Sequence, residues 1–398
     1  DVVGADVAGR RDERFAGGRA QDDEVLPDLA GAVGLNASGI LRSRETDAQV
    51  DRAVFADGRL RAPLRESLVD ARAPTSMYEE MLALRLFDAK AVALQRTGRL
   101  GTYPSCLGQE ATAVALGRTM AREDVLLGTY RETGTMLARG VRMSEILLYW
   151  SGDERGSAYS GPDAPKEDFP ICVPIATHAP QAVGVAYAMK LKREPRVAVC
   201  VLGDGATSKG DFYEALNGAG VWQLPLVFVV VNNEWAISVP RSAQTRAQTL
   251  AQKAIAAGIP GEQVDGNDVI AVHSVMQRAM AKARDGGGPH VVEALTYRLH
   301  DHTTADDATR YRTEADVERA KRLDPLARLK SYLVRERLWT EAQETAAREA
   351  CNARVEQAVA EFLAVPPRHP SSMFVHLFAE LPAALHEQRD AVRGADHE

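Results

Sequence analysis

The sequence predicts a doubly wound α/β fold, in which a mostly parallel sheet is flanked by helices and followed by a helical C-terminal extension. Two short runs rich in valine, Val197 to Leu202 and Leu226 to Val231, are typical of parallel strands that are covered on both faces. A helix-length stretch, Asp211 to Gln223, lies between them. The resulting order of strand, helix and strand is the unit from which such sheets are built.

The other elements follow from the spacing of apolar residues along the chain. From Thr75 to Arg96 these residues recur at helical spacing, and Gly98 follows as a C-terminal stop signal. A helical stretch from Asp268 to Arg284 precedes three glycines and the strand-like segment Pro289 to Thr296. The stretch from Ala315 to Phe362 is charged and poor in strand formers, which predicts helices packed on the sheet or on a partner.

We expect one domain, residues 47–398, which includes the helical part from about 315 to 398, preceded by an arm over residues 1–46. The arm has little apolar periodicity, which is typical of poorly ordered sequence. Acidic residues from Asp22 to Glu24 follow its basic stretch, whereas transit peptides are poor in acids. We therefore expect a cytoplasmic protein of bacterial type rather than one of the mitochondrial matrix.

Composition and charge exclude several classes of protein. A chain of 398 residues with 45% hydrophobic residues and a net charge of -7 is expected to be globular and not to bind nucleic acid. It has no apolar run long enough to span a bilayer. Neither a zinc site nor a disulfide framework is expected, because the cysteines are far apart and form no Cys-x-x-Cys pair. They are Cys106, Cys172, Cys200 and Cys351.

A carboxylate between two glycines follows the first valine-rich strand. Gly203, Asp204 and Gly205 stand where an open α/β sheet forms its ligand crevice. Glycines let backbone N–H groups approach a phosphate closely, and a neighbouring carboxylate can hold a Mg²⁺ ion that bridges two phosphates. By itself, an ordinary turn also explains this motif.

The second valine-rich strand ends in Asn232 and Asn233, which strengthens the interpretation. The ends of two neighbouring parallel strands come together at one edge of a sheet. Magnesium prefers hard oxygen ligands, so an Asp carboxylate, an Asn amide oxygen and a backbone carbonyl are suitable donors. The sequence therefore predicts a site for magnesium and a diphosphate at this edge.

The order of Gly-Asp-Gly, helix, apolar strand and Asn-Asn resembles the signature of thiamine-diphosphate enzymes. From about Val54 to the C-terminus, the chain resembles the alpha subunits of the branched-chain 2-oxo acid and pyruvate dehydrogenases. The phrases that carry this resemblance are residues 128–132 (Gly-Thr-Tyr-Arg-Glu), 208–211, 232–238, 257–261, 264–268 and the histidine-containing block 297–307. The resemblance implies a thiamine-diphosphate-binding fold.

The resemblance also implies roles for single residues. Asp204 and Asn233 would bind Mg²⁺ through their side chains, and Trp235 would bind it through its backbone carbonyl. The residues implied at the diphosphate are Tyr130, Arg131, Gly203, Gly205 and Ala206, and those implied at the aminopyrimidine ring are Val173 and Ile175. His302 matches the histidine near the thiazolium and the substrate, and it is the candidate general acid or base.

These residues have structural alternatives. Arg131 would be a surface ion-pair residue, and Trp235 would be an aromatic residue of the core. His302, His300 and His178 would be structural histidines. Thr303 and Thr313 lie near positions that are phosphorylated serines in eukaryotic relatives, and we interpret them as part of an unmodified polar loop.

The implied reaction is the oxidative decarboxylation of a 2-oxo acid with thiamine diphosphate and Mg²⁺. The acyl group would pass to the lipoyl group of a dihydrolipoyl acyltransferase. No segment resembles the one that carries the cofactor-activating glutamate, so a beta subunit is expected to supply it in an alpha2-beta2 heterotetramer. A chain of a different class, a non-catalytic scaffold paralogue that binds the beta subunit, is the alternative.

Substrate and local chemistry rest on smaller signals. Asp306-Asp307 and residues 373–383 resemble branched-chain alpha subunits, which favours substrates of the 3-methyl-2-oxobutanoate type; residues 257–261 resemble bacterial pyruvate ones. Acetoin dehydrogenase alpha subunits share the cofactor motif.

The segment 152–162 lacks the Met-Pro and His of many relatives, and Lys209 stands where an acid or amide is commoner. The region around Cys172 and Thr177-His178 differs from the eukaryotic potassium-binding loop, so potassium is not predicted.

Overall fold

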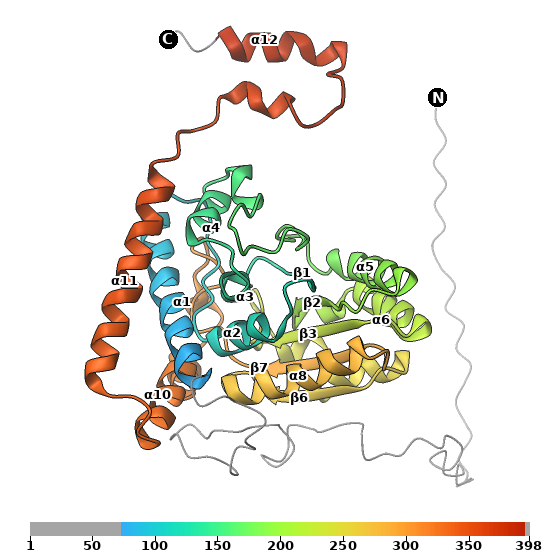
Figure 1. Ribbon diagram of the computed structural model, residues 1–398, viewed down its shortest axis with the longest axis vertical. Helices are drawn as coiled ribbons and strands as arrows, with labels where there is room; N and C mark the ends of the chain where they lie inside the picture. The colour runs from blue at the N-terminus through green and yellow to red at the C-terminus, as the bar shows by residue number, and fades with distance from the viewer. Residues whose placement is uncertain (1–72, 395–398) are drawn as a thin grey trace, which may run out of the picture. The chain divides into compact units, whose positions relative to one another are not determined.

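A computed structural model describes residues 73–394; the predicted arm over residues 1–46 lies outside the described residues. A parallel five-stranded sheet with strand order β1-β2-β3-β7-β6 forms the centre (Figure 1). Its strands are β1 (Val125–Leu127), β2 (Ala198–Gly203), β3 (Leu226–Asn232), β6 (Gly261–Asp265) and β7 (His290–Leu295). The strands predicted from the valine-rich runs are confirmed.

Helices cover both faces of this sheet, which confirms the doubly wound α/β class. Alternate strand residues belong to two different cores: Val199 and Val227 pack with one set of helices, whereas Cys200 and Phe228 pack with another. The first set is α1 (Ala73–Arg96), α2 (Glu110–Thr119) and α8 (Val269–Arg284), and the second is α5 (His178–Lys192) and α6 (Gly210–Trp222).

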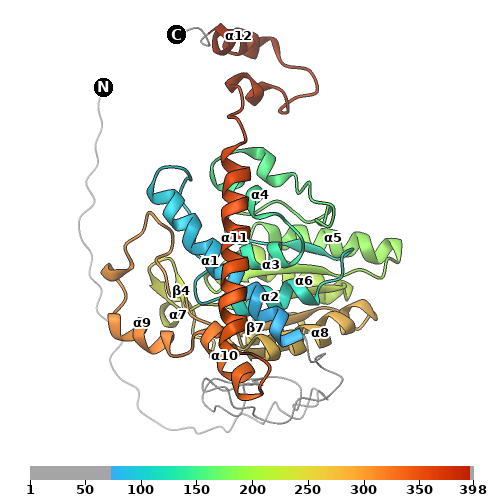
Figure 2. The same cartoon turned by 60° about the vertical axis from the view of Figure 1, so that its left-hand side comes forward.

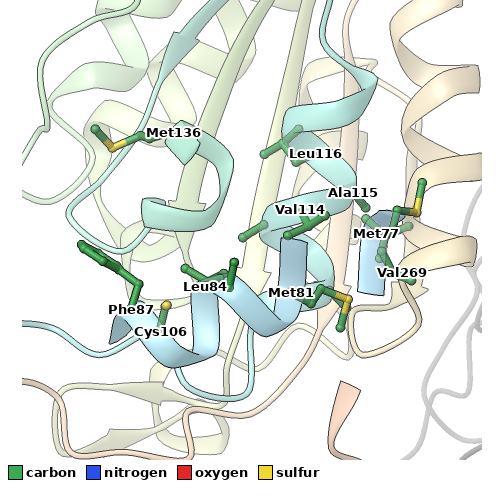
Figure 3. Packing of buried hydrophobic residues seen from close by; sticks show 14 of the residues in the cluster. Met77, Met81, Leu84, Phe87, Cys106, Val114, Ala115, Leu116, Met136 and Val269 are labelled. Carbon is green, nitrogen blue, oxygen red and sulfur yellow. The ribbon is translucent and has the colours of Figure 1, made fainter. Parts of the chain in front are cut away.

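Helix α1 is central to the larger core. Its apolar positions are buried, and Figure 3 shows Met81 and Leu84 of α1 beside Val114 of α2. Gly134, in α3 (Thr133–Ala138), permits close packing there, because an added Cβ would lie 2.5 Å from a methyl group of Leu84. The predicted helix over 75–96 is thus confirmed as a core-facing element.

The C-terminal part is helical, as predicted. It comprises α9 (Glu314–Lys321), α10 (Pro325–Arg335), α11 (Glu341–Leu363) and α12 (His386–Gly394). Helix α11 runs alongside α1, as Figures 1 and 2 both show, and it also contacts α4 (Met143–Trp150). A buried salt bridge of 2.9 Å between Arg328 of α10 and Asp265 of β6 ties these helices to the end of the sheet.

Short elements complete the fold. They are the hairpin β4 (Trp235–Ala236) and β5 (Val239–Pro240), helix α7 (Arg241–Gln244), and the 3₁₀ turns η3 (Glu154–Ser157), η4 (Gly205–Ser208), η5 (Ala251–Ala257), η6 (Ala308–Arg310), η7 (Pro370–Phe374) and η8 (Ala383–Leu385). No helix within residues 73–394 is both long and apolar enough to cross a membrane.

Candidate cofactor and metal site

A cavity of about 280 Å³ lies at the carboxyl ends of β2 and β3, where the sheet topology places a ligand crevice. It brings together nearly all the site residues predicted from the sequence. Those that line it are Tyr130, Arg131, Ile175, Gly203, Asp204, Gly205, Ala206, Asn233, Trp235 and His302. Val173 does not line it, and its side chain is 51% exposed in the isolated chain.

Asp204 is a buried carboxylate that no basic side chain of the described residues pairs with. It follows β2 directly, it is 1% exposed, and it forms no salt bridge with a basic residue of the described chain. Gln244 Nε2 donates a hydrogen bond of 2.6 Å to Asp204 Oδ2. Burial raises the pKa of Asp204, and the hydrogen bond from Gln244 offsets part of this effect. A buried carboxylate with a raised pKa would be stabilised in its charged form by a cation bound in the cavity.

Asn233 and Trp235 supply further oxygen atoms beside Asp204. The parallel register pairs Gly203 with Val231, so both strand ends open into the same cavity. The backbone N–H of Trp235 donates to Asn233 Oδ1 at 3.3 Å, which places the amide at the cavity wall. Residues 73–394 contain no group of three His, Cys, Asp or Glu side chains suited to a metal. The oxygen donors at the two strand ends are the Asp204 carboxylate, the Asn233 amide and backbone carbonyls, a set that suits a hard cation such as Mg²⁺.

The turn after Asp204 requires a glycine. A Cβ on Gly205 would lie 2.6 Å from the Cβ of Ala236, so only glycine lets η4 approach the β4 strand this closely. Lys253 of η5 supports the same turn from behind, because its Nζ donates to the Thr207 carbonyl at 2.6 Å. Burial and the nearby Arg241 lower the pKa of Lys253 to about 8.

Arg131 is a buried guanidinium that faces the cavity. Its Nη2 donates to the His302 carbonyl at 2.8 Å, and its Nη1 donates to the Ser105 carbonyl. It forms no salt bridge with a carboxylate within the described residues. The alternative of a surface ion-pair residue is therefore wrong, because the side chain is buried and its charge is left for an anionic ligand.

The imidazole of His302 lies close to two guanidinium groups, those of Arg131 and Arg298. The ring of Tyr130 packs edge-on against it at 5.9 Å. Its Nδ1 is 3.4 Å from Arg131 Nη2 and 3.5 Å from Arg298 Nη1. Burial, together with these two guanidinium groups, lowers the pKa of His302 to about 4, although Asp306 acts in the opposite direction. The imidazole is therefore neutral at pH 7.

The lowered pKa of His302 predicts a specific dependence of stability on pH. Between the unfolded-state pKa of about 6.5 and the folded-state value of about 4, only the unfolded chain gains a proton, so stability falls as the pH falls. Thermal unfolding of the ligand-free alpha–beta complex should show this loss between pH 7 and pH 5, and His302→Gln should reduce it. An equal loss in both proteins would contradict a neutral His302.

The cavity also contains residues that the sequence argument did not assign. They are Gln109, Thr129, Glu132, Lys209, Ala236, Ile237 and Arg298. Glu132 and Arg298 lie within the recognised phrases 128–132 and 297–307, which is a signal that was available. Gln109 precedes α2, far along the sequence from Asp204 and Asn233, and it belongs to no motif that the sequence argument recognised. Burial raises the pKa of the Glu132 carboxyl, whose hydrogen-bond donor is the Thr129 hydroxyl.

Several sequence departures lie outside the cavity. His178 is buried, and its Nε2 lies 2.7 Å from the Val201 carbonyl, which supports its interpretation as a structural histidine. None of residues 152–162 lines the main cavity; Tyr159 instead lines a small void behind Thr129 and Glu132. Lys209 does line the cavity, so its unusual charge belongs to the site.

The fold and the cavity define an α/β protein whose main cavity lies at the carboxyl ends of parallel strands. A family model described as "Dehydrogenase E1 component" matches residues 78–371, and the chain belongs to that family. It is 43% identical over 320 residues to a 3-methyl-2-oxobutanoate dehydrogenase subunit alpha of Mycobacterium tuberculosis, covering 80% of this chain and 86% of that protein.

A second group of relatives is similar over almost the same length. The chain is 38% identical over 313 residues to a pyruvate dehydrogenase E1 component subunit alpha of Staphylococcus aureus, covering 78% of this chain and 84% of that protein. Together, these matches confirm the resemblance to E1 dehydrogenase alpha subunits that the motifs indicated.

Proposed function

We propose that this chain takes part in the oxidative decarboxylation of a 2-oxo acid, with thiamine diphosphate and Mg²⁺, and in transfer of the acyl group to a lipoyl group. The observation that carries this proposal is that Asp204, Asn233, Arg131 and His302 converge on one cavity at the ends of two parallel strands. A scaffold without activity would not need a buried carboxylate and a buried guanidinium that both lack a counter-charge among residues 73–394.

The cofactor would be held by groups of opposite character. Asp204, Asn233 and the Trp235 carbonyl would hold the metal ion. The diphosphate would accept hydrogen bonds from Tyr130, from Arg131 and from the backbone near Gly203, Gly205 and Ala206, because these groups surround the cation donors. Ile175, which lines the cavity, would contact the ring system; Val173 stands on the same loop outside the cavity.

Bound thiamine diphosphate supplies the electron sink for loss of carbon dioxide. The chain supplies the surroundings. His302 Nδ1 faces two guanidinium donors, so it carries the lone pair, and the neutral ring must carry its proton on Nε2. The Nε2–H group is then the one that can donate a proton to a substrate oxygen. Burial, together with the charges of Arg131 and Arg298, lowers the pKa of His302 and keeps this ring neutral at pH 7.

The proposed partners are a beta subunit, in an alpha2-beta2 heterotetramer, and an acyltransferase with a lipoyl domain. Ile175 and Ile237 line the cavity yet remain 43% and 57% exposed, so its wall presents apolar surface to solvent in the isolated chain. Such a surface favours cover by a second protein chain. The bacterial origin of the relatives favours the cytoplasm.

Branched-chain 2-oxo acids are the favoured substrates. Identity is 43% to the 3-methyl-2-oxobutanoate relative and 38% to the pyruvate relative, and the Asp306-Asp307 phrase points the same way. Pyruvate is the second candidate, because the S. aureus relative covers nearly the same share of the chain, 78% against 80%.

The test is an assay of the chain co-expressed with its beta subunit. Dye-coupled decarboxylation is measured with 3-methyl-2-oxobutanoate, pyruvate and acetoin, with and without Mg²⁺ and thiamine diphosphate. We expect cofactor-dependent turnover with a preference for the branched acid. A preference for pyruvate or acetoin would change the substrate. A well-formed complex without turnover of any of the three would favour the scaffold alternative.

A further inference from the structure

Gln109 occupies an unusual place for a long polar side chain. It is the N-cap residue of α2, yet its side chain makes no capping hydrogen bond to that helix. It is only 4% exposed, and it lines the same cavity as Asp204 and Asn233. The Gln109 side chain therefore does not stabilise the N-terminus of α2 by capping it.

Hydrogen-bond logic determines which end of the Gln109 amide is free. The backbone N–H of Trp235 can only donate, so the Asn233 atom that faces it at 3.3 Å is the oxygen. Asn233 then presents its Nδ2 to Gln109, where Oε1 accepts a long hydrogen bond of 3.5 Å. The Gln109 Nε2 amide is left buried, and it has no hydrogen-bond partner within the described residues.

We propose that Gln109 is a further ligand-binding residue of this site, whose Nε2 donates to an anionic oxygen of the bound ligand while Oε1 holds the Asn233 amide in place. The oxygen would belong either to the diphosphate of the cofactor or to the carboxylate of the 2-oxo acid. This inference rests on the proposed function. It adds a neutral donor to a cavity that is also lined by the cationic Arg131 and the anionic Asp204.

A buried water is the physical competitor of the ligand for this donor. A void of about 10 Å³, lined by Gln109, Thr112, Arg131, Glu132 and Thr135 among others, lies beside the cavity. Its size is roughly that needed for one water molecule. If a water in this void satisfied Nε2 permanently, loss of the donor would not affect the affinity for cofactor or substrate.

Two substitutions in the co-expressed alpha–beta complex separate the two ends of the amide. Gln109→Glu keeps an oxygen for Asn233 but removes the donor, and Gln109→Leu removes both. Calorimetry measures the Kd of thiamine diphosphate at saturating Mg²⁺ without substrate, and steady-state assays give KM and kcat for the 2-oxo acid. Thr119→Val, which removes only a hydroxyl hydrogen bond to Ala115 within α2, is the control.

If the acceptor is the diphosphate, both Gln109 variants should raise the Kd roughly tenfold or more, and Gln109→Glu should raise it further by repulsion. If it is the substrate carboxylate, the Kd should stay near that of the wild type, and KM should rise roughly tenfold. Kd and KM both within about twofold of wild type in folded Gln109→Leu complex would overturn the inference. Failure of the wild-type complex itself to bind the cofactor would instead refute the proposed function.

Discussion

Asp204→Asn should abolish magnesium-dependent binding of thiamine diphosphate and at the same time make the ligand-free chain more stable. As the proposed metal ligand, Asp204 should matter more than residues around a metal site, whose loss typically weakens metal binding 10- to 100-fold, so we expect cofactor binding to weaken by more than ~100-fold. The gain in stability follows because the carboxylate of Asp204 is buried without a basic partner among the described residues, and its pKa is raised by burial.

The sign of the stability effect follows from that raised pKa. A carboxyl group whose folded-state pKa lies above its unfolded value disfavours folding once the pH exceeds both values. The neutral amide removes this cost, and it can still pair with Gln244. We expect a gain of about 1 kcal/mol in the free energy of unfolding at pH 7.

Calorimetric titration with the cofactor and thermal unfolding of the ligand-free complex measure both effects. Asp265→Asn is the matched control, because Asp265 is also buried but is paired with Arg328 at 2.9 Å. That control should lose stability by about 3–5 kcal/mol. If Asp204→Asn lost stability in the same way, Asp204 would be a structural residue rather than a metal ligand.

Arg131→Met should cause a loss of cofactor affinity of comparable size. The guanidinium is buried and has no carboxylate partner in the described chain, and one of its nitrogens holds the His302 backbone. The substitution would therefore remove the charge expected to neutralise the diphosphate and would release the loop that carries His302. We expect Kd to rise by at least ~100-fold, because charge-assisted hydrogen bonds in a buried site are strong and directional.

Arg131→Lys should recover little of this affinity. An ammonium group cannot reproduce two hydrogen bonds in one plane, to the carbonyls of Ser105 and His302, together with contact to a phosphate. Arg139→Met is the control for general loss of a buried arginine: it should lower the melting temperature while leaving the Kd of the folded complex unchanged. Equal Kd values for Arg131→Met and wild type would exclude Arg131 from the diphosphate site.

The strands and helices that build the site were predictable from local patterns. Buried parallel strands have nearly continuous apolar sequences, so Leu226–Asn232 was recognised to within one residue. The helix expected from Asp211 to Gln223 is α6, Gly210–Trp222. Because parallel strands end at one edge of a sheet, Asp204 and Asn233 were expected to meet, and they line one cavity.

Residues that depend on distant packing were not predictable in the same way. Gln109 reaches Asn233 across 124 positions of sequence, and Gln244 reaches Asp204 across 40. Neither lies in a motif with a recognisable spacing. Val173 shows that a local sequence match can also mislead. Its segment was recognised, but its side chain lies outside the cavity of the isolated chain.

The sequence by itself determined which chemical groups are available and on which strand ends they stand, because these depend on residue identity and on periodicity over short spans. Only the tertiary structure decided the state of each group. The neutral His302 and the Arg131 guanidinium without a carboxylate result from burial and from neighbours far away in sequence. The Gln109 amide left free for a ligand has the same origin. Desolvation and pairing act through space, so no local pattern of residues specifies them.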